Sequence, residues 1–177
     1  DLAIRAGLPP PDSPFVMARR LCSFRRVLCA SPEFLRANGP IRAVEDLEKI
    51  PCILQGPLPT TWQLETEQGP RTARVDGSFR SGNLIVVKEA ALSGLGIAQL
   101  PEWLVAEELA QRRLVPVLEG ALLPLISVQG VFHQGARSSR SVRAVLDHLE
   151  RELPGRLSRI APQARAAPAK PRRRRAT

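Results

Sequence analysis

The stretch KEAALSGLGIAQLPEWLVAEELAQRRLVPVL, residues 88–118, decides the fold. A helical pattern leads into a glycine-rich turn at 94–96, and the apolar run 97–100 follows as a short strand. Glycine suits this turn because it tolerates the left-handed backbone of a helix end. Pro101 favours the first turn of a second helix, and residues 114–118 predict a second short strand. Helices and strands that alternate at this pace predict a layered α/β fold with a largely parallel sheet.

Towards the N-terminus, the sequence predicts a strand over residues 25–30 and a helix that begins at Ser31 and Pro32. Serine suits the N-cap position of a helix, and proline suits its first turn. Residues 62–65 and 72–75 predict an antiparallel hairpin around a polar turn.

Towards the C-terminus, residues 125–132 alternate in hydropathy, which predicts a strand with one apolar face. A final helix is predicted from the serines near residue 138 through an apolar stripe that ends at Pro154 and Gly155. Residues 156–177 consist largely of Ala, Pro and Arg, a composition that predicts disorder.

Composition predicts a folded body with a basic tail. The chain has 177 residues, 44% of them hydrophobic, which is enough for a core. Its formal net charge is +9, but residues 156–177 supply +8 and leave only +1 for residues 1–155. Lys170, Arg172, Arg173, Arg174 and Arg175 are candidates for non-specific nucleic-acid contacts. The alternative is a solubilising tail, because no aromatic residues are interleaved with these charges.

The three cysteines have neither an even count nor a C-x-x-C spacing, which argues against a disulfide framework and a zinc site. A reducing cytoplasm is the expected compartment. The sequence shows no signal peptide and no apolar run approaching the ~20 residues that span a bilayer. It begins with the strand-like DLAIR and without Met, and we therefore expect a chain cut inside a domain.

Motifs for catalysis are missing from the sequence. Its two histidines lie near no Cys, Ser or carboxylate pattern of a catalytic triad. The Gly94-Leu95-Gly96 turn fails as a dinucleotide fingerprint, because Gln99 stands where the third glycine belongs. We predict no enzyme activity, no cofactor and no metal site.

Two polar segments are candidates for ligand binding. Ser31 with Pro32, and the loop Ser81-Gly82-Asn83, each precede a predicted helix. Free backbone N–H groups at such helix starts favour a carboxylate or a similar anion. The alternative is that Ser31, Ser81 and Asn83 only cap their helices.

Several segments together resemble the effector-binding domain of LysR-type transcriptional regulators, over about residues 1 to 153. They match in order: DLAIR at 1–5, VLCASPEFLRANGP at 27–40, VEDLEKIPCI at 44–53, AALSGLGIAQLPEWLVAEELAQRRLVPVL at 90–118 and VRAVLDHLE at 142–150.

The resemblance implies two α/β lobes of the periplasmic-binding-protein type (type 2), with a small effector bound between them. Residues 1–10 would end lobe I and make the first crossing, and residues 11–97 would form lobe II. Residues 98–155 would make the second crossing and complete lobe I. Ser31, Pro32 and the Ser81-Gly82-Asn83 loop fall where this family usually contacts its ligand.

The same resemblance implies a bacterial-type regulator that binds promoter DNA through a winged helix-turn-helix, which would precede Asp1. RNA polymerase is a further possible partner, and the intact protein would be a homodimer or homotetramer in the cytoplasm. The first lobe would be incomplete, so we expect marginal stability or aggregation. One cooperative unfolding transition of a monomer would contradict that expectation. The alternatives are a solute-binding protein of the same fold and, third, an enzyme of the related transferase class.

Overall fold

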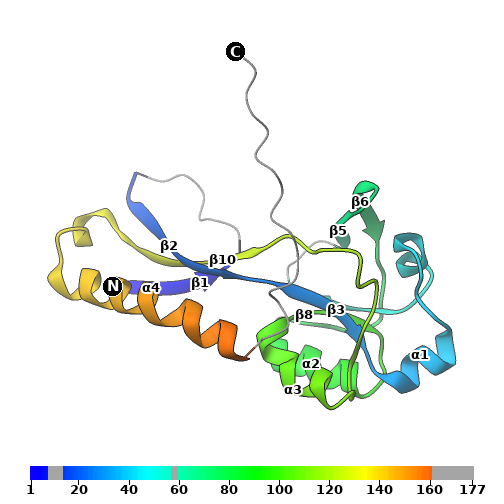
Figure 1. Cartoon of the computed structure of the whole chain (residues 1–177). Helices are drawn as coiled ribbons and strands as arrows, with labels where there is room; N and C mark the ends of the chain where they lie inside the picture. Colours follow the sequence, from blue (N-terminus) through cyan, green and yellow to red (C-terminus); the bar gives the residue numbers. More distant parts are fainter. Residues whose placement is uncertain (8–13, 57–59, 161–177) are drawn as a thin grey trace.

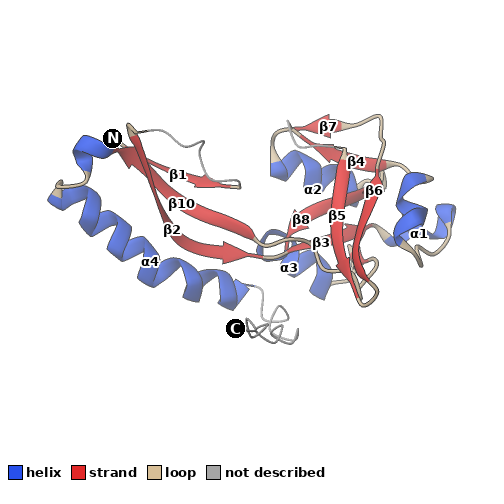
Figure 2. Ribbon diagram, turned by 90° about the horizontal axis from the view of Figure 1, so that it is seen from above, coloured by secondary structure: helices blue, strands red, loops and turns tan. Residues whose placement is uncertain are grey.

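The structure is a computed structural model that describes residues 1–7, 14–56 and 60–160. The described chain forms two units that lie side by side and are joined by two crossing segments (Figure 1). One unit is a three-stranded antiparallel sheet with a long helix. The other is a five-stranded mixed sheet with helices and a separate hairpin packed around it (Figure 2). We call them the three-stranded unit and the five-stranded unit.

The three-stranded unit has β10 (Ile126–His133) in the middle, with β1 (Leu2–Ala6) on one side and β2 (Val16–Phe24) on the other. Both pairings are antiparallel. Helix α4 (Arg140–Ile160) packs over the sheet, and an added Cβ at Gly130 would overlap Leu146 Cδ2. Glycine at this position therefore lets the helix approach the middle strand closely.

The five-stranded unit has the strand order β7-β4-β8-β3-β9. Its strands are β7 (Arg80–Ser81), β4 (Cys52–Gln55), β8 (Ile97–Pro101), β3 (Arg26–Ala30) and β9 (Val115–Pro116). β4 is parallel to β7 and β8, whereas β3 is antiparallel to β8 and to β9. The prediction of a largely parallel sheet is therefore correct only for β7, β4 and β8, because β3 enters from the opposite side.

Both faces of the five-stranded sheet are covered. Helices α2 (Leu84–Leu92) and α3 (Glu102–Ala110) enclose one core cluster, built on Cys29, Ile53, Ala98 and Leu100. The other face packs against α1 (Pro32–Asn38), the short helix η1 (Val44–Glu48) and the hairpin of β5 (Thr61–Thr66) and β6 (Gly69–Arg74). The antiparallel pairing of β5 with β6 confirms the predicted hairpin.

The crossings differ in place from those expected. β2 pairs with β10 in the three-stranded unit, and only Arg25 separates it from β3 in the five-stranded unit. The second crossing is the segment 117–125, between β9 and β10. Residues 16–24 were expected in lobe II, but they pair within the three-stranded unit. Residues 98–101 were expected in the second crossing, but they lie inside the five-stranded sheet. Pairing between distant strands sets these boundaries, and local sequence patterns do not indicate which strands pair.

The last helix also differs from the prediction at its end. Ser139 Oγ accepts from Val142 N at 3.4 Å, as expected of a capping serine. The helix then continues through Pro154 and Gly155 to Ile160, so residues 156–160 are helical. An internal proline removes one backbone hydrogen bond of a helix without ending it. Residues 161–177, including Lys170 and Arg172–Arg175, lie outside the described residues.

Candidate functional site

Three strands of the five-stranded sheet end on the same side of the sheet. Because β7, β4 and β8 are parallel, their carboxyl ends meet at the edge that faces the three-stranded unit (Figure 2). Gln55 pairs with Ser81, and Gly56 N donates to Ser81 O at 2.8 Å. Open α/β sheets commonly bind ligands at such an edge.

The loop from Ser81 to Asn83 is held at this edge by its own hydrogen bonds. Asn83 Oδ1 accepts from Ile85 N at 2.9 Å, which caps α2, and Ser81 Oγ accepts from Asn83 N at 3.2 Å. Gly82 and Asn83 are exposed. An added Cβ at Gly82 would meet no atom within 4 Å, so open space lies above this residue.

Ser31 lies at the opposite edge of the sheet. The antiparallel register places Cys29 opposite Ala98, so the end of β3 lies beside the start of β8. Ser31 is 4% exposed, and its Oγ accepts from Phe34 N at 3.2 Å as the N-cap of α1, with Pro32 as the first helical residue. The structure therefore does not bring Ser31 and Pro32 together with the Ser81-Gly82-Asn83 loop.

A polar pair between β3 and β8, inside the five-stranded unit, was not predicted. Gln99 of β8 is 6% exposed, and its Oε1 accepts from Arg26 Nη1 at 2.7 Å. Burial lowers the pKa of Arg26. The available sequence signal was the single polar residue in the apolar run IAQLP.

Helices α2 and α3 are joined by an ion pair at the core. Glu108 of α3 is 5% exposed, and its Oε1 lies 2.9 Å from Lys88 Nζ and 3.6 Å from Arg113 Nη2. Burial opposes ionisation of Glu108, but the hydrogen bond from Lys88 and the two positive charges outweigh it, so its pKa is lowered. This cluster holds the two helices together.

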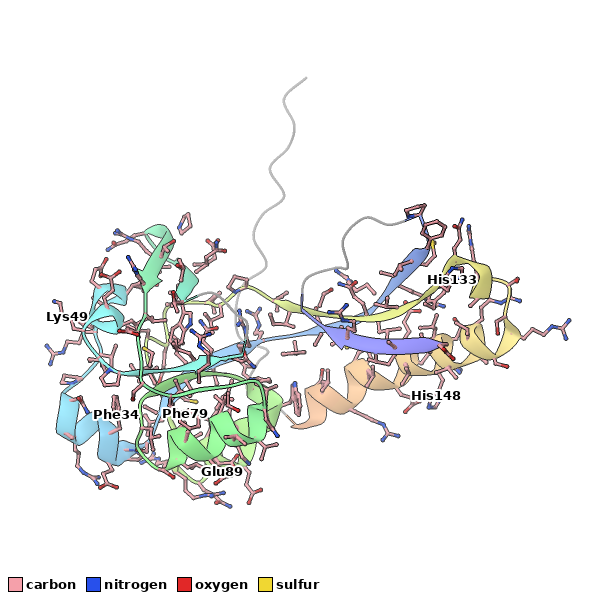
Figure 3. All side chains as sticks on the ribbon, turned by 180° about the vertical axis from the view of Figure 1, so that it is seen from behind. Phe34, Lys49, Phe79, Glu89, His133 and His148 are labelled. Carbon is pink, nitrogen blue, oxygen red and sulfur yellow. The ribbon has the colours of Figure 1, made fainter. Side chains whose placement is uncertain are left out.

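The histidines and cysteines form no reactive group. Figure 3 shows His133 and His148 on the three-stranded unit, far from Phe34 of α1. Cysteines 22, 29 and 52 are free and buried, and burial raises the pKa of Cys29 and of Cys52 to about 12. Within the described residues, no group of three His, Cys, Asp or Glu side chains could hold a metal ion. In the same part of the chain, no helix is long and apolar enough to cross a membrane.

The cavities on the five-stranded unit include one near η1 and one near Arg26. One of about 290 Å³ lies between η1, the hairpin turn and residues 118–121. The other, of about 140 Å³, lies beside Arg26 where the chain crosses between the units. Neither is lined by Ser31, Pro32 or the Ser81-Gly82-Asn83 loop.

Sequence comparison places this architecture among known proteins. The model of the family described as the LysR substrate binding domain matches residues 1–154. The HTH-type transcriptional regulator DmlR of Escherichia coli K12 is 34% identical over 153 residues, 84% of this chain and 48% of that protein. The regulator CrgA of Neisseria meningitidis is 30% identical over 157 residues, 86% of this chain and 51% of that protein. The chain thus spans about half the length of the curated relatives it matches.

Solved structures agree with this placement. The regulatory domain of CrgA from Neisseria meningitidis aligns with a TM-score of 0.72 at 28% identity, covering 86% of this chain and 75% of that one. The full-length virulence activator AphB of Vibrio cholerae aligns with a TM-score of 0.70 at 27% identity, covering 85% of this chain and 51% of that one. These likenesses confirm the predicted two-lobed α/β fold class.

Proposed function

Because this chain belongs to the LysR substrate binding domain family, we propose that it senses a small effector on behalf of a DNA-binding transcriptional regulator. The observation that carries this proposal is the family match over residues 1–154, together with a polar loop at the sheet edge that faces the other unit. The named relatives are transcriptional regulators, which fits a protein that is not an enzyme.

The proposed effector site lies between the two units, at the Ser81-Gly82-Asn83 loop. On the opposite side, β1 ends near the crossing, where Gly7 N donates to Ser127 O at 3.0 Å (Figure 2). The loop offers polar side chains and open space at Gly82. Ser31 takes a structural role in this proposal, since it is buried and caps α1 at the opposite end of the sheet.

The proposed mechanism is a change in how the two units are arranged. An effector that touches both units binds one arrangement more tightly than the others, and it therefore shifts the population towards that arrangement. In the intact protein this shift would change how DNA-binding domains hold a promoter. We further propose that the intact protein is a homodimer or homotetramer, that RNA polymerase is a possible partner, and that it works in the cytoplasm, where the promoter is.

The test is a thermal-shift screen of small carboxylic acids, amino acids and sugar acids against the chain and its Gly82→Leu variant. Leucine at Gly82 adds a side chain at the proposed site, where an added Cβ meets no atom within 4 Å. A compound that stabilises the chain should lose its effect in Gly82→Leu. The matched control is Gly120→Leu, another exposed glycine with no atom within 4 Å of an added Cβ. If Gly82→Leu keeps the full response, the effector binds elsewhere and the proposed site is wrong.

A further inference from the structure

Next to the crossing, β3 begins with the half-buried Arg26, which has no acidic partner among the described residues. Arg26 Nη1 donates to the neutral Gln99, whereas Arg26 Nε is buried and has no hydrogen-bond partner. Among the ion pairs of the described residues, none includes Arg26. Partial burial of a charge without a counter-charge is unfavourable, so an anion that pairs with this guanidinium would be stabilised.

Arg26 also lines a cavity. It has a volume of about 140 Å³ and is lined by Arg25 and Arg26, by Glu102 of α3, and by residues of the second crossing that include Glu119. A water molecule takes up about 30 Å³ of liquid, so the cavity has room for a small organic acid. Glu119 is exposed, and burial raises the pKa of Glu102 from its usual value. The lining therefore carries two arginines and two acidic residues.

We propose that this cavity is a second ligand site, in which Arg26 pairs with the carboxylate of a small organic acid. The bond to Gln99 uses Nη1, which leaves Nε and Nη2 on the other edge of the guanidinium. That edge fits the two oxygens of a carboxylate and gives a strong, bidentate pair. The site is separate from the proposed effector site, because Ser81, Gly82 and Asn83 do not line the cavity.

Occupancy of this cavity is coupled to the arrangement of the two units. Arg26 Nε has almost no accessible surface, so a carboxylate reaches it only when the crossing shifts. The crossing also carries Phe24, whose ring packs edge-on against Trp103 with centroids 6.1 Å apart. The indole Nε1 of Trp103 is likewise buried without a partner. Trp103 therefore reports on a shift of the crossing.

The experiment uses the full chain with Trp62→Phe, which leaves Trp103 as its single tryptophan. Acetate and oxalate are titrated at constant ionic strength, with chloride as the comparison anion, while fluorescence and the thermal midpoint are recorded. We expect a saturable fluorescence change with the carboxylates and at least tenfold weaker binding after Arg26→Gln. The matched control is Arg20→Gln, which removes the same charge from an exposed position of β2.

Arg26→Lys covers the case in which Arg26→Gln fails to fold. It keeps the positive charge but not the planar fork, so it should bind acetate more weakly and lose the preference over chloride. The proposal is overturned if the parent chain gives no saturable response to acetate or oxalate. It is also overturned if Arg20→Gln weakens binding as much as the Arg26 variants do, because the effect is then general charge attraction.

Discussion

The two units contain similar elements but bury very different amounts of side chain. The five-stranded unit has core clusters on both faces of its sheet, and these include most of the buried apolar residues that the structure describes. The three-stranded unit has helix α4 on its sheet, and its buried side chains are Leu21, Cys22, Gln129 and Leu146. Burial of apolar surface is the main stabilising contribution to a fold. The five-stranded unit should therefore be a rigid platform, and the three-stranded unit the part that opens first.

This difference suits a sensor with a movable contact between its parts. The Ser81-Gly82-Asn83 loop and the Arg26 cavity both belong to the five-stranded unit, which holds their positions fixed. The three-stranded unit can change its arrangement at little expense in core packing. A ligand that contacts both units can therefore shift the arrangement of the three-stranded unit.

Two leucine truncations test the comparison with the largest expected effect. Leu100 and Leu146 are fully buried, one in each unit. Leu→Ala at such sites costs about 2–5 kcal/mol. We expect Leu100→Ala to lower the stability of the whole chain by about 4 kcal/mol. Leu146→Ala should instead unfold the three-stranded unit alone, at a loss of about 3 kcal/mol. Urea unfolding followed by tryptophan fluorescence, which comes from Trp62 and Trp103 of the five-stranded unit, and by circular dichroism separates the two results. If fluorescence and circular dichroism change together in both variants, the two units unfold as one and do not differ in stability.

Lys88→Met should give the next largest effect. It leaves buried Glu108 with only the more distant Arg113, so we expect a loss of about 2–3 kcal/mol. The comparison variant in the three-stranded unit is Arg19→Met, which breaks exposed pairs with Asp147 and Glu150 and should change stability little. Chemical unfolding at neutral pH measures both. Similar losses would mean that the Lys88 pair is no more than a surface contact.

The same pair predicts a pH dependence. The pKa of Glu108 is lowered from its usual 4.5 in the folded chain. The unfolded chain therefore binds a proton first as pH falls, and the stability from Glu108 is present above pH 4.5 and is lost as pH drops below it. Lys88→Met should flatten this acid-side loss, which unfolding curves between pH 3 and pH 6 would show, a window of about 1.5 units on each side. An unchanged slope would assign the acid sensitivity to other carboxylates.

The two helix caps give the smallest effects on stability. Ser31→Ala and Asn83→Ala each remove one side-chain cap and should cost about 1 kcal/mol. They differ in function, because Ser31→Ala should leave effector binding unchanged whereas Asn83→Ala should weaken it. Asn83→Asp keeps the capping oxygen and so separates the cap from the contact. Weaker binding in Ser31→Ala would move the site to the far edge of the sheet.

Local patterns predicted the elements well but not their assembly. Ser31 with Pro32 and the alternation in residues 125–132 identified a helix start and a strand that the structure contains. The crossings, the antiparallel entry of β3 and the opposite positions of Ser31 and Ser81 depend on pairing between distant strands, which no local pattern records. Arg26 was missed because the fold brings it together with residues 116–123 at one cavity, and these residues lie far from it in the sequence.

The most direct test of the unequal units is the rate at which the three cysteines react with a thiol reagent in the native chain. Cys22 lies in the three-stranded unit, and Cys29 and Cys52 lie in the five-stranded unit. All three are buried, and the thiolate is the reactive form, so each must wait for local opening. We expect mass spectrometry to show Cys22 labelled well before the other two. Labelling of all three cysteines at one common rate would show a single cooperative unit and contradict this account.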